Sequence, residues 1–406
     1  MNSMKNLNLK LHSLVIFRSL LSKPIIKSFM SLLEELGSND IAAGVDAYCD
    51  FTSKLYDTGS NWSRCLLELA LDDENTCVLL TAQGKSLSEF MSESLTRELA
   101  VLQEVSEVSC AQIQMIISTD IALPCWENEG IDIAAAYNDR LKQLHKKGYG
   151  IFAKHHVFSV NGNGELVPVS HPDTQRMNDL IGYENERRKV VVNTLALLDG
   201  MRANNILLYG DAGTGKSSTV KAIVNEYAEQ GLRLIEIQKQ RLHFLPDLME
   251  RLACNPLKFI LFIDDLSFSS NDEGFTALKA ILEGSVAARS QNVAIYATSN
   301  RRHLVKETFS DRAGDELHLA DTLEEVSSLS ARFGLTITFS KPDKDLYHSI
   351  LEHLAQEYNL KTPLYKLVIQ AEAFAIRNGG RSPRTARQFA DLTRANELAA
   401  EKEENI

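Results

Sequence analysis

The chain has few of the features that mark membrane, secreted or metal-binding proteins. None of its apolar stretches approaches the ~20 residues that a membrane-spanning helix needs, and no small-residue cleavage site follows its N-terminal segment. Six cysteines are spread along 406 residues without a C-x-x-C pair or zinc-like spacing, and the ten histidines form no ligand pattern. We therefore expect a cytoplasmic protein with reduced thiols, long enough for two or three domains.

Basic residues are also in deficit, with 43 Lys and Arg against 54 Asp and Glu and a net charge of −11. This balance argues against a broad nonspecific nucleic-acid surface, although local basic patches remain compatible with it. The N-terminus is the exception, because it holds five Lys and Arg and no acid before Glu34.

The apolar residues of this N-terminal segment follow helical spacing at Leu14, Phe17, Leu20 and Leu21, and Pro24 is expected to end or kink that helix. We expect a basic amphipathic helix that packs against its own chain or a partner subunit. Contact with a membrane surface and an organelle-type presequence are the alternatives.

Residues 31–150 read mostly as helices and carry no catalytic constellation. The stretch 86–108 places apolar side chains at spacings of three and four, which is typical of a packed helix: Leu87, Phe90, Met91, Leu95, Leu99 and Leu102. From 148 to 169 short apolar runs surround Asn161-Gly-Asn-Gly164, a turn signal typical of a hairpin. We expect a mostly helical region over 1–147, then a hairpin and linker over 148–177.

After residue 178, apolar runs alternate with helical segments. The runs lie at 206–209, 234–237, 259–263, 293–297 and 335–339. This alternation predicts an α/β domain over 178–340 with a parallel sheet and helices on both faces, followed by a helical region over 341–406. In such sheets ligands bind beyond the carboxyl ends of the strands.

The first of these runs leads into a Gly-rich loop and then into a helix. The loop consists of Gly210, Asp211, Ala212, Gly213, Thr214, Gly215, Lys216 and Ser217, and Ser218 follows. Glycines let backbone N–H groups curl around phosphate oxygens, and the helix N-terminus adds partial positive charge. Lys216 is expected to reach the β- and γ-phosphates, and the Ser217 hydroxyl to bind Mg²⁺. The pattern predicts nucleoside triphosphate binding; a Gly-rich turn with a chance Lys-Ser pair is the alternative.

Polar side chains end two of the other runs. Asp264 and Asp265 follow the run 259–263, where a metal-side carboxylate and a base are expected, respectively. Taken alone, this pair is also compatible with the cap of a turn or helix. Asn300 follows the run 293–297 closely and is placed to orient water against the γ-phosphate; a simple turn residue is the alternative.

Arginines mark the last part of the chain. Ser382 is placed to cap a helix that starts with Pro383, so that Arg384 and Arg387 lie on its first turns. Cations there oppose the helix dipole, and nucleotide phosphate is the expected compensation; a solvated basic face is the alternative. Arg332 stands directly before the run 335–339.

Taken in order, these segments resemble the motifs of the AAA+ ATPases. The loop ending at Ser217 looks like Walker A, Asp264-Asp265 like Walker B and Asn300 like sensor 1. Arg332 looks like the arginine finger, and Arg384 like the sensor 2 arginine of a helical lid.

Longer phrases strengthen this resemblance. Those at 262–268, 278–284 and 297–304 are similar to an uncharacterised bacterial AAA+ family of unknown function. The phrases around Arg332 and Arg384 are similar to those of the Holliday-junction branch-migration motor. The resemblance covers residues 178–400 and does not extend into the N-terminal half.

The resemblance implies an AAA+ sheet domain with a C-terminal α-helical lid, ATP and Mg²⁺ held between them, and assembly into a ring or partial ring, for example a hexamer. Within 180–183, Ile181 and Gly182 would line the adenine. One departure concerns hydrolysis, because most AAA+ motors carry Asp-Glu where this chain has Asp264-Asp265, and a shorter carboxylate must sit closer to the water or act through a second one.

Two functions follow from this reading. The first is a Mg²⁺-dependent ATPase that remodels an unidentified protein or nucleic acid. The alternative is a nucleotide-gated adaptor or loader-like module that hydrolyses little. Arg332 and Asp265 favour the enzyme, because a passive holder has no use for a finger or a base.

Overall fold

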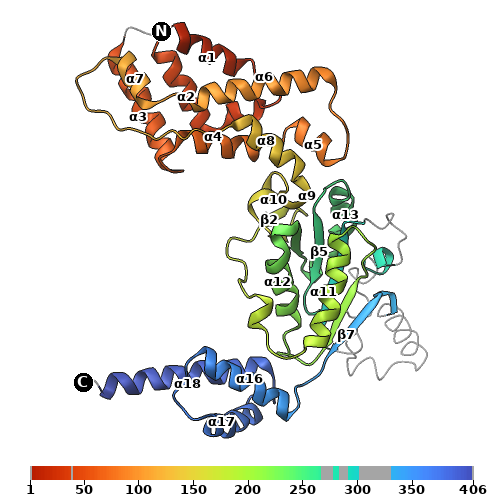
Figure 1. Ribbon diagram of the computed structural model, residues 1–406. Coiled ribbons are helices and arrows are strands. Elements are labelled where there is room, and N and C mark those ends of the chain that lie inside the picture. The colour runs from red at the N-terminus through yellow and green to blue at the C-terminus, as the bar shows by residue number, and fades with distance from the viewer. Residues whose placement is uncertain (1, 38–39, 267–277, 283–290, 301–330, 405–406) are drawn as a thin grey trace. The chain divides into compact units, whose positions relative to one another are not determined.

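The computed structural model describes residues 2–37, 40–266, 278–282, 291–300 and 331–404, which form the coloured ribbon of Figure 1. The chain divides into two compact units, Met1–Lys154 and His155–Ile406. Among the described residues, no helix is long and apolar enough to cross a membrane. Each unit has a core of its own.

The first unit is helical, as the sequence predicts. Six of its helices begin after a side chain that accepts a hydrogen bond from the first turn, which fixes where each helix starts: Asp40, Asn61, Asn75, Ser88, Ser109 and Asp132. The elements are α1 (Asn2–His12), η1 (Arg18–Ser22), α2 (Pro24–Glu35), α3 (Ile41–Tyr56), α4 (Trp62–Leu71), α5 (Thr76–Ala82), α6 (Glu89–Ser106), α7 (Cys110–Ile117), α8 (Ile133–Lys142), α9 (Leu144–Lys147) and α10 (Ile151–Lys154).

Aromatic rings fill the centre of this unit. The Trp62 ring centroid lies 4.9 Å from that of Phe29 and 5.0 Å from that of Phe51. Trp126 lies 5.1 Å from both Tyr48 and Phe51. Such contacts between large buried rings give the helical unit a well-packed hydrophobic core.

Three expectations for this unit are wrong in detail. The helix expected over Leu14–Leu21 is absent, because α1 ends at His12 and the next element is the short 3₁₀ helix η1. Pro24 starts α2 instead of ending a helix, since a helix's first residue needs no N–H donor. Phe90, expected on the packed stripe of α6, is 80% exposed.

The N-terminal segment nevertheless packs against its own chain. Leu14, Phe17 and Leu20 are buried in the core of the first unit. The carboxylate of Glu98, itself buried on α6, accepts hydrogen bonds from three consecutive backbone N–H groups at 15–17. This carboxylate takes the place of helical hydrogen bonds there, which explains why the apolar residues pack without forming the expected helix.

The second unit contains a seven-stranded sheet in the order β2-β1-β4-β5-β6-β3-β7. Its strands are β1 (Val157–Val160), β2 (Leu166–Pro168), β3 (Ile206–Gly210), β4 (Leu232–Glu236), β5 (Lys258–Ile263), β6 (Val293–Ser299) and β7 (Leu335–Phe339). All neighbouring pairs are parallel except β1 and β2, which form the predicted hairpin. The hairpin joins the main sheet, because β1 pairs with β4.

Helices cover both faces of this sheet. On one face, α11 (Glu184–Leu198) and α12 (Lys216–Tyr227) pack their buried side chains against alternate residues of β3, β5 and β6 (Figure 1). On β5 the other alternate side chains, Phe259, Leu261 and Ile263, are also fully buried, on the face that carries α13 (Leu245–Ala253). Short 3₁₀ helices lie in the described part of the connections: η2 (Met177–Asp179), η3 (Ala228–Gln230) and η4 (Lys239–Phe244).

A helical lid follows β7. It consists of α16 (Lys344–Glu357), α17 (Leu364–Arg377) and α18 (Pro383–Glu404), drawn in blue in Figure 1. These helices share a core built on Tyr347, Leu351 and Leu354, which Ala371 and Phe389 join. The predicted α/β fold with a C-terminal helical lid and a helical N-terminal region is therefore confirmed.

Candidate nucleotide-binding site

The Gly-rich loop 210–217 connects the end of β3 to the start of α12, the strand, loop and helix order expected of a phosphate loop. Gly210, Gly213 and Gly215 have φ of 135°, 77° and 91°, which only glycine adopts readily. At Gly210 a Cβ would lie 2.1 Å from the backbone oxygen of Phe339 on the neighbouring strand β7. Glycine is thus required there both by conformation and by space.

Lys216 is buried at the first position of α12. Its Nζ donates hydrogen bonds to the backbone oxygens of Gly210 at 2.9 Å and Asp211 at 2.7 Å, and to Oδ1 of Asn300 at 3.0 Å. Burial lowers the pKa of Lys216, an effect that the nearby carboxylates, Asp211 first among them, oppose. Three oxygen atoms therefore hold the ammonium group beside the loop.

Asp264 follows β5 and lies beside the start of α12. Ser217 Oγ donates a hydrogen bond of 2.6 Å to Asp264 Oδ1. The same oxygen accepts a bond of 2.5 Å from the hydroxyl of Thr298, on β6. A hydroxyl and a carboxylate from separate segments are thus brought together, and a neighbouring strand orients the carboxylate.

Asp265 and Asn300 are also brought together, because β5 and β6 are neighbours in parallel register. Asn300 Nδ2 donates a hydrogen bond of 2.9 Å to Asp265 Oδ1, while the other end of the same amide accepts from Lys216. The backbone of Asp265 has φ of 51°, the left-handed region that is costly for a residue with a Cβ. Its N–H donates to the hydroxyl of Thr298 at 2.8 Å, which helps to hold this conformation.

These side chains surround a cavity of about 540 Å³. Of the predicted site residues, those that line it are Ile181, Ala212, Gly213, Thr214, Gly215, Lys216, Ser217, Ser218, Asp264, Asp265, Asn300 and Arg384. The lid contributes Ile350, Leu354 and Arg387 as well. Four described residues of the predicted site do not line the cavity: Gly182, Gly210, Asp211 and Arg332.

The start of α18 reaches the phosphate loop. Ser382 caps this helix as predicted, with its Oγ accepting from the N–H of Thr385 at 3.1 Å. The N–H of Arg384 donates to the backbone oxygen of Gly213 at 3.2 Å. The lid therefore touches the loop directly, and this contact places Arg384 at the cavity.

Other predicted features fall at or beyond the edges of the described residues. Arg332 is half-buried just before β7, while the residues 301–330 ahead of it lie outside the described part of the chain. The motif phrases at 262–268, 278–284 and 297–304 each run past their last described residue.

Sequence reasoning missed several polar residues that line the cavity, among them Thr298 and Arg187. Thr298 is one residue inside the polar end of β6, a position that only its pairing with β5 makes important. Arg187 is a buried cation on α11, and burial lowers its pKa while Glu184 opposes the shift. The sequence gives no signal for Arg187, because it belongs to the charged run 184–189, and charged residues on a helix usually face solvent.

Several solved structures are similar to part of this chain. A variant of Thermotoga maritima RuvB is 18% identical over 53% of this chain and 63% of its own, with a TM-score of 0.36. AMPPCP-bound DnaA from Aquifex aeolicus is 18% identical over 57% of this chain and 69% of its own, with a TM-score of 0.38. A katanin structure, which concerns the structural basis of katanin self-assembly, is 19% identical over 56% of this chain and 73% of its own, with a TM-score of 0.33. The chain spans less than two thirds of the RuvB chain, so these likenesses do not bear on activity.

A family assignment covers most of the second unit. Residues 153–397, more than half of the 406-residue chain, match the family described as "Protein of unknown function (DUF815)". The match contains the phosphate loop, the carboxylates after β5 and the lid arginines. It confirms the resemblance to a family of unknown function that the long phrases indicated. The chain belongs to the DUF815 family.

Proposed function

We propose that the chain is a Mg²⁺-dependent ATPase that couples hydrolysis to remodelling of an unidentified protein or nucleic acid. The observation that carries this proposal is the convergence of Lys216, Asp264, Asp265 and Asn300 on one cavity of about 540 Å³. That volume is in the usual range for cofactor-sized ligands, about 300 to 1,000 Å³. The four residues come from the phosphate loop and the ends of two neighbouring strands, where α/β sheets bind ligands.

The lining of the cavity suits both the phosphates and the base of ATP. The loop glycines and the start of α12 offer backbone N–H groups and Lys216 to phosphate. Arg384 adds a second cation from the lid. Ile181, Ile350 and Leu354, which belong to one apolar cluster, give apolar surface for a base.

The donor set also fits Mg²⁺. Ser217 Oγ and Asp264 Oδ1 are 2.6 Å apart, and hydroxyl and carboxylate oxygens are the hard ligands that Mg²⁺ prefers. In phosphoryl transfer the ion supplies charge neutralisation for the developing phosphate. We assign Ser217 and Asp264 to hold it, with Thr298 keeping the carboxylate in place.

Asp265 is the proposed general base for the attacking water. Its Oδ1 accepts from Asn300, which leaves the second carboxylate oxygen to accept a proton. Because Asn300 also binds Lys216, the base and the phosphate-facing cation are held in one geometry. Asn300 therefore acts by orienting both groups.

Assembly and movement complete the proposal. Arg332 is assigned as a finger that acts on the nucleotide of a neighbouring subunit in a ring or partial ring, for example a hexamer. This fits its half-buried position away from the cavity of its own chain. The lid over 341–406 and the helical region over 1–147 are the parts we expect to move during the cycle of this cytoplasmic protein.

One observation favours a second function, a nucleotide-gated adaptor or loader that hydrolyses little. Asp265 has the shorter carboxylate, and its left-handed backbone and its bond to Asn300 restrict how far it can reach toward water. In this second function, ATP binding without hydrolysis would be enough to change the state of the assembly.

Two measurements on the full-length protein separate these functions. Calorimetry with ATP and Mg²⁺ tests binding, and steady-state phosphate release, with and without EDTA, tests hydrolysis. Binding together with EDTA-sensitive phosphate release supports the ATPase. Binding without release, even at high protein concentration, supports the adaptor, and no binding overturns both.

A further inference from the structure

Asp211 is the second residue of the phosphate loop, yet its side chain turns away from the cavity. Its Oδ2 accepts a hydrogen bond of 3.0 Å from the backbone N–H of Lys341. The backbone N–H of Asp211 donates in turn to the oxygen of Phe339 at 3.1 Å. The loop is thus bonded twice to the end of β7 and to the hinge, by which we mean residues 340–343 between β7 and α16.

Tyr183 holds the same hinge from the adenine side of the site. Its hydroxyl donates a hydrogen bond of 2.6 Å to the backbone oxygen of Ser340, next to Lys341. Its ring packs on Phe339, with centroids 5.3 Å apart. Burial raises the pKa of Tyr183, so the hydroxyl keeps its proton as a donor. Two consecutive hinge residues are therefore bonded to the proposed nucleotide site: Ser340 to Tyr183, and Lys341 to the phosphate loop.

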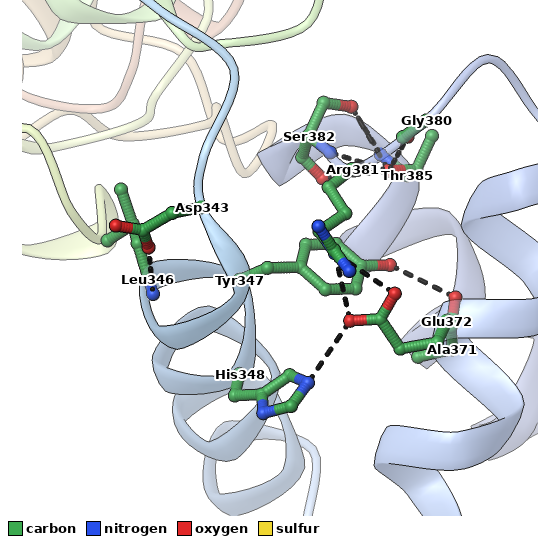
Figure 2. Close-up of polar contacts among 10 residues, drawn as sticks. All are labelled: Asp343, Leu346, Tyr347, His348, Ala371, Glu372, Gly380, Arg381, Ser382 and Thr385. Atoms are coloured by element: carbon green, nitrogen blue, oxygen red, sulfur yellow. Dashed lines mark hydrogen bonds and ion pairs between the residues drawn. The ribbon is translucent and has the colours of Figure 1, made fainter.

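The hinge is linked onward to the loop that precedes α18. Lys341 Nζ donates to the backbone oxygen of Gly379 at 3.4 Å. Figure 2 shows how the rest of that loop is tied to the lid: Arg381 Nε binds both carboxylate oxygens of Glu372, at 2.9 and 3.0 Å. His348 Nε2 lies 3.1 Å from the same carboxylate. Glu372 on α17 thus joins α16 to the start of α18.

The contacts then return to the phosphate loop. The N–H of Arg384 donates to the oxygen of Gly213, and a Cβ at Gly213 would lie 3.0 Å from Cβ of Arg384. These hydrogen bonds therefore form a continuous circuit that runs from Asp211 through the hinge and the lid and returns to the phosphate loop at Gly213. Because the three lid helices are bonded to one another, displacement of the hinge shifts the start of α18 with it.

We propose that Asp211 and Tyr183 are positioning residues that fasten the hinge to the nucleotide site and thereby hold Arg384 over the phosphate loop. The inference rests on the proposed function, in which Arg384 binds nucleotide phosphate. It assigns to Asp211 a role other than contact with the nucleotide. A purely local role, stiffening of the phosphate loop itself, is the competing explanation.

The test measures affinity of the full-length chain for the non-hydrolysable analogue AMPPCP with Mg²⁺, by calorimetry, in a double-mutant cycle. Asp211→Ala, Asp211→Asn and Tyr183→Phe are each made alone and together with Arg384→Ala. Asparagine keeps an acceptor for the Lys341 N–H, and phenylalanine keeps the ring on Phe339. Thermal unfolding of each variant checks that it is folded.

We expect Asp211→Ala and Tyr183→Phe to weaken binding about tenfold, and Asp211→Asn by less than about threefold. In the Arg384→Ala background the same changes should cost less than about twofold, because the group that they position is gone. Equal losses in both backgrounds would show that Asp211 stiffens the loop alone, and would overturn the inference. Unchanged AMPPCP affinity in Tyr183→Phe, the most conservative of the three substitutions, would also overturn the inference.

Two outcomes distinguish this inference from the proposed function. If the unmodified chain binds AMPPCP but Arg384→Ala binds equally well, the inference is overturned and nucleotide binding stands. If the unmodified chain does not bind, the proposed function itself is wrong, and the inference falls with it.

Discussion

Thr298 and Asp264 are joined by a hydrogen bond of 2.5 Å between neighbouring strand ends. The threonine hydroxyl also accepts from the backbone N–H of Asp265, so one side chain fixes both carboxylate residues. Thr298 is buried, with only 2% of its surface exposed to solvent. The arrangement of the proposed metal ligand and base therefore depends on a residue of a different strand.

Thr298→Val should remove this support with little change of shape. It removes the shorter of two hydrogen bonds of the Asp265 N–H and leaves the bond of 3.2 Å to Asp264 Oδ1, so we expect a loss of about 0.5 to 1.5 kcal/mol of unfolding free energy. It also removes one of the hydrogen bonds that orient the Asp264 carboxylate, so we expect half-maximal turnover to need about tenfold more Mg²⁺. Denaturant unfolding and a Mg²⁺ titration of phosphate release measure the two effects. Thr298→Ser keeps the hydroxyl and should restore the Mg²⁺ dependence; a Mg²⁺ titration unchanged by Thr298→Val would exclude the role.

Lys216→Ala should lower ATP affinity at least about 100-fold, because it removes the cation that faces the phosphates. Circular dichroism should show a folded protein, since the change touches no apolar core. Lys221→Ala on the same helix is the matched control, as its ion pair with Glu236 is on the surface and contributes little. Calorimetry that finds equal ATP affinity in Lys216→Ala and the control would rule out the phosphate-loop assignment.

Asp265→Asn should keep ATP bound and reduce hydrolysis by about 10² to 10⁴. The amide preserves the shape of the side chain but cannot accept a proton. Asp247→Asn, an exposed acid on α13, serves as the control and should turn over normally. Phosphate release at the unmodified rate in Asp265→Asn would move the base elsewhere. Glu273 and Glu283, which are outside the described residues, are the next candidates.

Arg332→Ala should bind ATP normally and hydrolyse about 10³ to 10⁵ more slowly, as expected for loss of a finger. Lys216→Ala is inactive for another reason, because it cannot hold nucleotide but still offers Arg332. Mixing the two variants should restore part of the phosphate release at interfaces where each supplies what the other lacks. Mixed assemblies that form without recovering activity would indicate that Arg332 acts within its own chain.

The Glu372 cluster of the lid predicts a specific acid sensitivity. Burial alone would raise the pKa of Glu372, but hydrogen bonds from Arg381 and His348 outweigh it and lower the pKa below its ordinary value of 4.5. The stabilisation is therefore present above about pH 4.5 and is lost as the pH falls through the lower folded-state pKa. Glu372→Gln should be less stable than the unmodified chain at pH 7, with the difference shrinking in acid.

Denaturant unfolding at a series of pH values between about 7 and 3 measures this difference. Glu352→Gln, an exposed acid on α16, is the control and should not change the pH profile in this way. A stability difference between Glu372→Gln and the unmodified chain that stays constant over this range would contradict the assignment of the cluster.

The sequence by itself determined the sheet and the chemistry of the phosphate loop. The five predicted strands all form. Four of them are apolar runs that are buried on both faces of a parallel sheet, while β7, at the edge of the sheet, buries only alternate side chains. The glycines and Lys216 could be recognised without any fold, since their function depends on local backbone conformation. Ser382 was recognisable as a helix cap for the same reason.

The tertiary structure alone decided which segments meet. Thr298 became part of the site because β6 lies beside β5, and Asp211 turned toward the hinge because β3 lies beside β7. The segment around Leu14 packs without forming a helix because a distant carboxylate, Glu98, binds its backbone. Such contacts join residues far apart in the chain, and periodicity and local propensity carry no information about long-range pairing. Only the folded chain brings these partners within hydrogen-bonding distance.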